Sequence, residues 1–121
     1  MWHGFEGRKF PRVKADCCIY IKQLDHGGQP ITTTTENIGM GGICVILSES
    51  LEKFSTIKMD LDLGDGGQRI SCDGRVAWIV PSRDFVSGKL THDTGIEFLN
   101  LSQTAHERIE QMIRSRSHDF H

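Results

Sequence analysis

The stretch IKMDLDLGDGGQRISCDGRVAWIV, residues 57–80, indicates the fold class. Apolar and polar residues alternate over 57–63, which is typical of a half-buried strand. GDGG, residues 64–67, is a strong hairpin signal, and apolar residues return at even spacing over 70–80. Gly74 within this second run predicts a bulge or bend in the strand. The stretch therefore predicts two antiparallel strands joined by a glycine-rich turn.

Four further strands are expected around this hairpin. The period-2 pattern or a β-branched run marks each of them, and a polar loop at 82–91 precedes the last. These strands are expected at 13–22, 31–35, 43–47 and 92–98.

Only the end of the chain looks helical, from about residue 103. Thr104 and Glu107 fit a capping box at its start. An apolar stripe at helical spacing follows, and two arginines suit the negative end of the helix dipole. The stripe is Ala105, Ile109, Met112 and Ile113, and the arginines are Arg114 and Arg116. The residues alone therefore favour a small antiparallel barrel or sandwich with one terminal helix.

Length and composition place the chain among ordinary globular domains. Its 121 residues fit a single domain, with 37% apolar and 25% charged residues. The first residues lack the apolar core of a signal peptide, and no apolar run approaches the ~20 residues of a membrane span. We therefore expect a cytoplasmic protein without membrane insertion. The net charge of −2 argues against a general nucleic-acid binder.

The cysteines and histidines do not form a metal-binding pattern. Cys17 and Cys18 are adjacent, so a strand would point them to opposite faces. Cys44 and Cys72 stand alone, and no histidine pair has metal-ligand spacing. We expect core or half-buried thiols and no metal site.

The glycine-rich stretch ENIGMGG, residues 36–42, fails the nucleotide-loop patterns. Neither Lys nor Ser/Thr follows Gly42 as a P-loop requires, and Cys44 occupies the place of the third glycine in G-x-G-x-x-G. Asp60 and Asp62 share the outer face of one strand and are expected to be solvated. Because no catalytic constellation is marked by spacing, we expect a binding module and not an enzyme.

The segment RKFPRVK, residues 8–14, concentrates four of the fourteen basic residues. It is either a solvated basic patch or a local anion site. Arginine guanidinium groups bind phosphate oxygens bidentately and match the O6/N7 edge of guanine. Asn37 can offer an acceptor and a donor to a base edge, and the glycines beside it allow close approach and a positive φ.

RKFPR followed by NIGMGG resembles the PilZ domain family, whose signature is Arg-x-x-x-Arg and then (Asp/Asn)-x-Ser-x-x-Gly. Arg8 and Arg12 match the first motif, and Asn37 and Gly42 match the ends of the second. GRVAWIV at 74–80 and TGIEFLNLS at 94–102 resemble later parts of such domains. The departure is Gly39, which stands where the family has Ser.

The resemblance implies an all-β, six-stranded antiparallel barrel with one C-terminal α-helix that binds the bacterial second messenger cyclic di-GMP. Residues 1–12 would form a flexible arm carrying the arginines, and residues 13–121 a single barrel domain. In the family, the arginines engage phosphates and guanines, and the second motif holds a guanine. Ligand binding drapes the arm over the barrel and creates a surface for a partner.

The resemblance thus implies a cyclic di-GMP-binding effector that signals through an unidentified protein, as a monomer or weak homodimer. The rival is a degenerate adaptor that binds its partner without ligand, with Gly39 as the mark of the lost site. Trp78 either stacks on a guanine or continues the even-numbered core pattern of its strand. Lys9 either contacts a phosphate or is a solvated flank of the motif.

Overall fold

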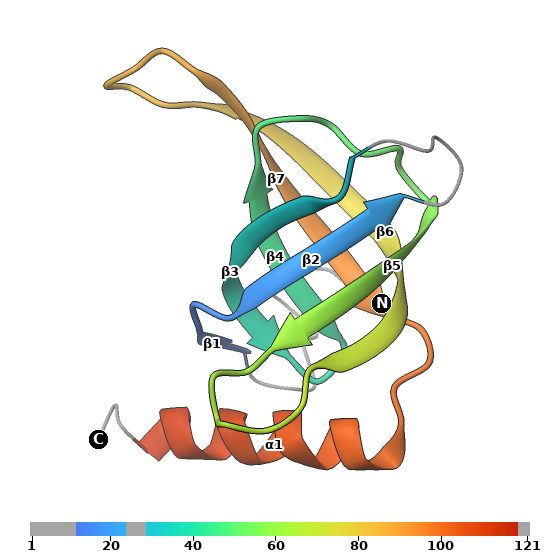
Figure 1. Ribbon diagram of the computed structural model, residues 1–121. Helices are drawn as coiled ribbons and strands as arrows, with labels where there is room; N and C mark the ends of the chain where they lie inside the picture. Colours follow the sequence, from blue (N-terminus) through green and yellow to red (C-terminus); the bar gives the residue numbers. More distant parts are fainter. Residues whose placement is uncertain (1–11, 24–28, 119–121) are drawn as a thin grey trace.

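The computed structural model describes residues 12–23 and 29–118 and contains seven strand segments and one helix (Figure 1). In chain order these are β1 (Arg12–Lys14), β2 (Cys18–Gln23), β3 (Ile31–Gly39), β4 (Gly42–Leu47), β5 (Thr56–Asp62), β6 (Ile70–Arg83), β7 (Leu90–Phe98) and α1 (Gln103–His118).

The strands form one closed antiparallel barrel. Their order is β1-β3-β2-β5-β6-β7-β4, and an additional pairing between β3 and β4 closes the sheet into a barrel. β1 and β2 both pair with β3, β1 with its C-terminal part and β2 with its N-terminal part. They are therefore two pieces of one broken strand, and the barrel has the six strands that the sequence predicts.

The break in the first strand has an identifiable cause. Thr35 is fully buried, and its hydroxyl accepts a hydrogen bond from the Cys17 amide at 3.1 Å and donates one to the Ala15 carbonyl. Backbone bonds from Ala15 to Glu36 and from Thr35 to Cys17 keep the broken region on β3. The Thr35 side chain thus provides the hydrogen bonds that these two backbone groups would otherwise make with a neighbouring strand.

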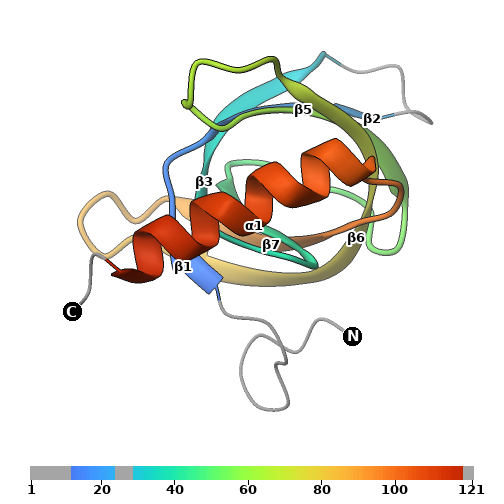
Figure 2. The same ribbon diagram turned by 90° about the horizontal axis from the view of Figure 1, so that it is seen from below.

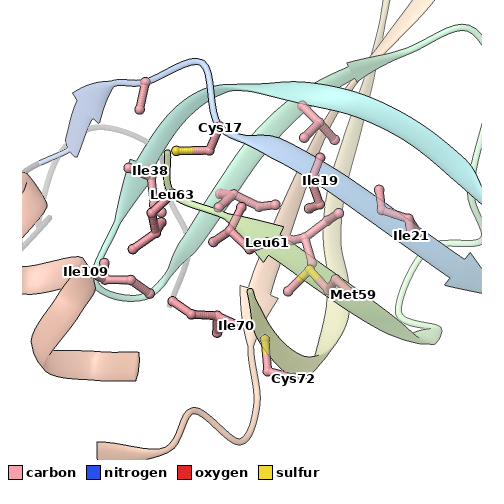
Figure 3. Close-up of a cluster of buried hydrophobic side chains, with 14 of the residues drawn as sticks. Cys17, Ile19, Ile21, Ile38, Met59, Leu61, Leu63, Ile70, Cys72 and Ile109 are labelled. Carbon is pink, nitrogen blue, oxygen red and sulfur yellow. The ribbon is translucent and has the colours of Figure 1, made fainter. Parts of the chain in front are cut away.

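The barrel interior is filled by aliphatic side chains from every strand. Figure 3 shows this cluster, with Ile19 and Ile21 of β2 near Met59 and Leu61 of β5. The alternation predicted for the first strand and for 57–63 is confirmed, because the predicted apolar positions are buried. All four cysteines are free, and Cys18 is exposed whereas its neighbour Cys17 is buried, as the strand geometry requires.

The helix α1 lies across one end of the barrel (Figure 2). Ala105, Ile109 and Ile113 are buried against the core, and Met112 packs beside them, as the stripe predicts. The Arg108 guanidinium donates to Asp65 at 2.7 Å and to the Gln68 carbonyl at 2.6 Å in the β5–β6 turn. The hydrogen bonds from Arg108 to the Asp65 carboxylate lower the pKa of Asp65. In the part of the chain that the structure describes, no helix has both the length and the apolar character needed to cross a membrane.

The start of α1 differs from the prediction. The Ser102 hydroxyl accepts a hydrogen bond from the Ala105 amide at 3.1 Å, so Ser102 is the N-cap. Thr104 lies inside the first turn, since the helix begins at Gln103. The predicted capping box at Thr104 and Glu107 is therefore wrong by two residues.

The predicted bulge at Gly74 is also misplaced. Gly74 continues the register of β6 with Ile57, and a Cβ there would collide with the side chains of Ile96 and Met59. The register shift lies between Val76 and Trp78, opposite β7. Gly74 is therefore explained by close core packing.

The β6–β7 hairpin is longer than the sequence predicts. The ladder continues through Arg83 paired with Leu90, so the connecting loop is 84–89 and not 82–91. Figure 1 shows this hairpin projecting from the end of the barrel opposite α1.

Gly42→Ala is expected to lower the free energy of unfolding by about 2–4 kcal/mol. The added Cβ would overlap the carbonyl oxygen of Ile96 on β7, so the backbone that closes the barrel would have to move. Gly64→Ala is the matched control, because its Cβ meets open space and only the φ of 74° is strained, at about 1–2 kcal/mol. Urea unfolding measures both, and a loss at Gly42 no larger than at Gly64 contradicts this reading.

The helix cap is tested by a second pair of variants. Ser102→Ala should destabilise the protein by about 1 kcal/mol, because it removes the acceptor for the Ala105 amide. Thr104→Ala should change stability by less than about 0.5 kcal/mol, since Thr104 is an exposed position inside the first turn. Thermal unfolding of both variants provides the measurement. If Thr104→Ala is the more damaging change, the assignment of Ser102 is wrong.

Candidate ligand-binding site

The pairing of β1 with β3 brings parts of the two sequence motifs together. Arg12 lies opposite Gly39 and Lys14 opposite Asn37 in the antiparallel register. The Arg12 Nη1 donates a hydrogen bond to Asn37 Oδ1 at 3.4 Å. Arg12 and Asn37, 25 positions apart in the sequence, are therefore direct neighbours. Arg8 and Lys9, the other predicted basic residues, lie outside the described residues.

The alternation of the strands places this contact on the outer face of the barrel. Val13 and Ile38, which lie between the paired positions, are buried in the core. Because successive side chains point to opposite faces, Arg12 and Asn37 point outward. Both are half-buried, so they combine contact with solvent and partial shielding from it.

The glycines of the second motif have roles different from those predicted. Gly39 is the last residue of β3, and the positive-φ glycines among the described residues are Gly64, Gly66 and Gly88. The positive φ that the sequence allows beside Asn37 is therefore not adopted by the glycines of this motif. Gly39 instead leaves a position without a side chain directly opposite Arg12.

Gly42 is required by packing. A Cβ at Gly42 would run into the backbone of Ile96 and Glu97, since β4 and β7 approach closely there. The identity of this residue thus has a structural explanation that is independent of any ligand.

Trp78 lies on the same outer face as the motif residues. The register shift after Val76 leaves Trp78 opposite Gly95, while Ile79 pairs with the buried Thr94 and packs on the core. The even-numbered core pattern therefore stops at Val76, and the reading of Trp78 as a core residue is wrong. Its side chain is half-buried, and its Nε1 has no hydrogen-bond partner within the described part of the chain.

The pairings connect these positions into one line across four strands. Asn37 pairs with Cys44, Cys44 with Gly95, and Gly95 with Trp78. We call Asn37, Cys44, Gly95 and Trp78 the outer-face row. Burial raises the pKa of the Cys44 thiol to about 11, so this residue contributes a neutral surface. Gly95, which is buried, contributes no side chain to the row.

Sequence reasoning did not identify Cys44 or Gly95 as site residues. Each belongs to a different strand, and only the register of β4 on β3 and on β7 aligns them with Asn37. A guanidinium, an amide and an aromatic side chain on one outer face suit a flat anionic ligand with a hydrogen-bonding edge.

Comparisons with known proteins agree with this architecture. A family model described as the PilZ domain matches residues 6–115. No curated protein sequence matches the chain at a significant level.

Three solved structures illustrate the likeness in fold. MotI/DgrA, the inhibitor of motility from Bacillus subtilis, has a TM-score of 0.77 at 19% identity over 95% of this chain and 53% of its own. The PilZ domain of YcgR from Escherichia coli, solved with c-di-GMP, has a TM-score of 0.73 at 16% identity over 94% of both chains. MrkH from K. pneumonia, solved in its c-di-GMP complex, has a TM-score of 0.72 at 16% identity over 90% of this chain and 52% of its own.

The chain thus spans about half the length of MotI and MrkH and nearly the whole isolated YcgR domain. The family match covers most of the 121 residues. The chain therefore belongs to the PilZ domain family.

Proposed function

We propose that this protein is a receptor for cyclic di-GMP. The observation that carries the proposal is the hydrogen bond between Arg12 and Asn37, which joins the two halves of a split site. The YcgR and MrkH structures that share its fold contain c-di-GMP, which supports the choice of ligand.

Each residue of the site has a distinct chemical task. Arg12, with Arg8 of the same motif, supplies guanidinium groups to the phosphates and to the guanine O6/N7 edge. Asn37 offers its amide to a guanine edge. Trp78, which pairs with Gly95, presents an aromatic surface on which a base can stack. Lys9 can add a phosphate contact.

Gly39 weakens this site without removing its charged groups. The missing neutral hydroxyl bond is worth roughly 0.5–1.5 kcal/mol, which corresponds to about 2- to 12-fold in affinity. Gly39 lies in β3 and is paired with Arg12, so the strand fixes its backbone. We therefore expect no further loss of affinity from backbone flexibility at this glycine. We therefore infer weakened binding.

The protein would act as an effector through another protein. PilZ domains bind ligands or partners and are not enzymes, and the site described above has no acid–base or nucleophile pair. We infer that ligand binding orders residues 1–11 against the outer-face row, which makes a surface for the partner. The alternative is an adaptor that binds its partner without ligand.

In either case we propose a cytoplasmic protein, monomeric or weakly dimeric, that neither enters membranes nor binds nucleic acid.

Isothermal titration with cyclic di-GMP separates the receptor from the ligand-independent adaptor. The receptor should show saturable heat with ligand at about 100 μM, whereas absence of heat at that concentration would reject the receptor proposal.

Arg12→Ala should weaken cyclic di-GMP binding by about 100-fold, because it removes charge-assisted bonds of roughly 3 kcal/mol in total. Arg69→Ala is the matched control. Arg69 is an exposed arginine stacked on Tyr20, 4.2 Å from the ring centroid, and belongs to neither motif. The affinities come from the same titration. Unchanged binding by Arg12→Ala would mean that the site lies elsewhere even if the protein is a receptor.

Gly39→Ser should tighten binding by up to about tenfold, since it restores the hydroxyl beside Arg12. Gly39→Ala separates the hydroxyl from the added Cβ and should not tighten binding. The ratio of the two dissociation constants is the measured quantity. A serine variant that binds no better than the alanine variant would show that β3 has adapted to glycine.

A further inference from the structure

The tip of the β6–β7 hairpin, residues 84–89, presents two apolar side chains to solvent. Phe85 is fully exposed and Val86 is 96% exposed. Scattered apolar residues on a surface are ordinary. Phe85 and Val86 are instead adjacent, and they lie at the end of a hairpin that projects from the barrel (Figure 1). Two such apolar side chains can serve as a small anchor that a partner encloses.

The turn that carries these side chains is tightly organised. The Asp84 carboxylate accepts hydrogen bonds from the Val86 amide at 3.1 Å and the Ser87 hydroxyl at 2.9 Å. The Asp84 amide donates to the Lys89 carbonyl, and the Gly88 amide donates to the Asp84 carbonyl. Gly88 has a φ of 72°, which favours glycine. A preorganised turn loses little conformational entropy on binding.

The charges around the tip indicate the kind of partner. Arg83 and Lys89 flank the two apolar residues. Arg83 also donates to the Gly88 carbonyl at 2.6 Å, so its charge is held beside the turn. The hydrogen bond from Ser87 lowers the pKa of Asp84, which stays ionised at neutral pH. An ionised carboxylate next to Phe85 disfavours insertion of the tip into the hydrocarbon core of a bilayer, where the carboxylate would be desolvated.

The tip is continuous with the candidate ligand site. The same two strands carry Trp78 and Gly95, and they run on to the tip without interruption. Between the two regions, the exposed side chains of Val80 and Ile46 lie on either side of Asp93 in the ladder. One partner can therefore contact the tip and the ligand-bearing face together.

We propose that the hairpin tip is the docking anchor for a protein partner whose surface has an apolar pocket with an acidic rim. Phe85 and Val86 fill the pocket, and Arg83 and Lys89 face the acidic rim. The anchor does not depend on cyclic di-GMP, because the tip lies at the barrel end opposite α1 and the β3–β4 turn (Figure 1). Cyclic di-GMP could also raise the affinity for this partner, and that additional effect alone rests on the proposed receptor function.

Photo-cross-linking identifies the occupant of the tip. We would introduce p-benzoylphenylalanine at Phe85 of the full chain, in the cells that naturally produce it. The matched control is the same group at Phe54, an exposed phenylalanine that is 66% accessible and also lies beside a lysine. The expected result is an adduct with another protein at position 85 only, mapping to apolar residues flanked by Asp or Glu. No adduct, an adduct between two copies, a lipid adduct, or equal adducts at both positions would overturn the proposal.

The purified pair then gives the quantitative test, without cyclic di-GMP. Phe85→Ser should weaken partner binding at least about tenfold, and Phe54→Ser should leave it unchanged. Lys89→Glu should weaken it by several-fold at low salt and by less at high salt. Phe85→Ser should keep the cyclic di-GMP affinity and melting temperature of the parent, which separates this test from that of receptor function. Partner affinity unaffected by Phe85→Ser would overturn the proposal.

Discussion

The buried hydroxyl of Thr35 is the contact on which the arrangement of the site depends. It satisfies the Cys17 amide and the Ala15 carbonyl where the first strand breaks. The chain can therefore change direction at this point while both of its pieces remain on the same edge of β3. Without this hydroxyl, buried backbone groups would lose their partners. The break leaves β1 against the end of β3, where Arg12 reaches Asn37.

Much of the fold could be predicted from local alternation, because most strands bury one face and expose the other. The pattern at 57–63 succeeded for this reason. The same alternation rule failed in β6 after Val76. A register shift there exchanges the inner and outer faces of the strand, although apolar residues continue in the sequence. Nothing in the local sequence marks that shift, and Gly74 offered a plausible but incorrect position for it. The break at Thr35 was equally hidden, because the alternation of buried residues continues through it.

The candidate site was predictable only in part. Arg12 and Asn37 could be paired because the two motifs that carry them resemble the signature of the PilZ family. Cys44 and Gly95 could not, since their alignment depends on how β4 lies against β3 and β7. Trp78 was identified with two competing roles, and the register shift excludes the core role. The outer surface that results carries a cation, an amide and an aromatic ring, which are the groups on which the proposed ligand site depends.

The central claim is that the two motifs form one ligand site through the pairing of β1 with β3. A titration of the ¹⁵N-labelled protein with cyclic di-GMP, followed by amide and indole resonances, tests this most directly. The account predicts that the largest shift changes fall on the amides of Arg12, Asn37 and Gly39 and on the Trp78 indole, while β2 and β5 change little. Shift changes confined to β2 and β5, or no changes at saturating ligand, would contradict it.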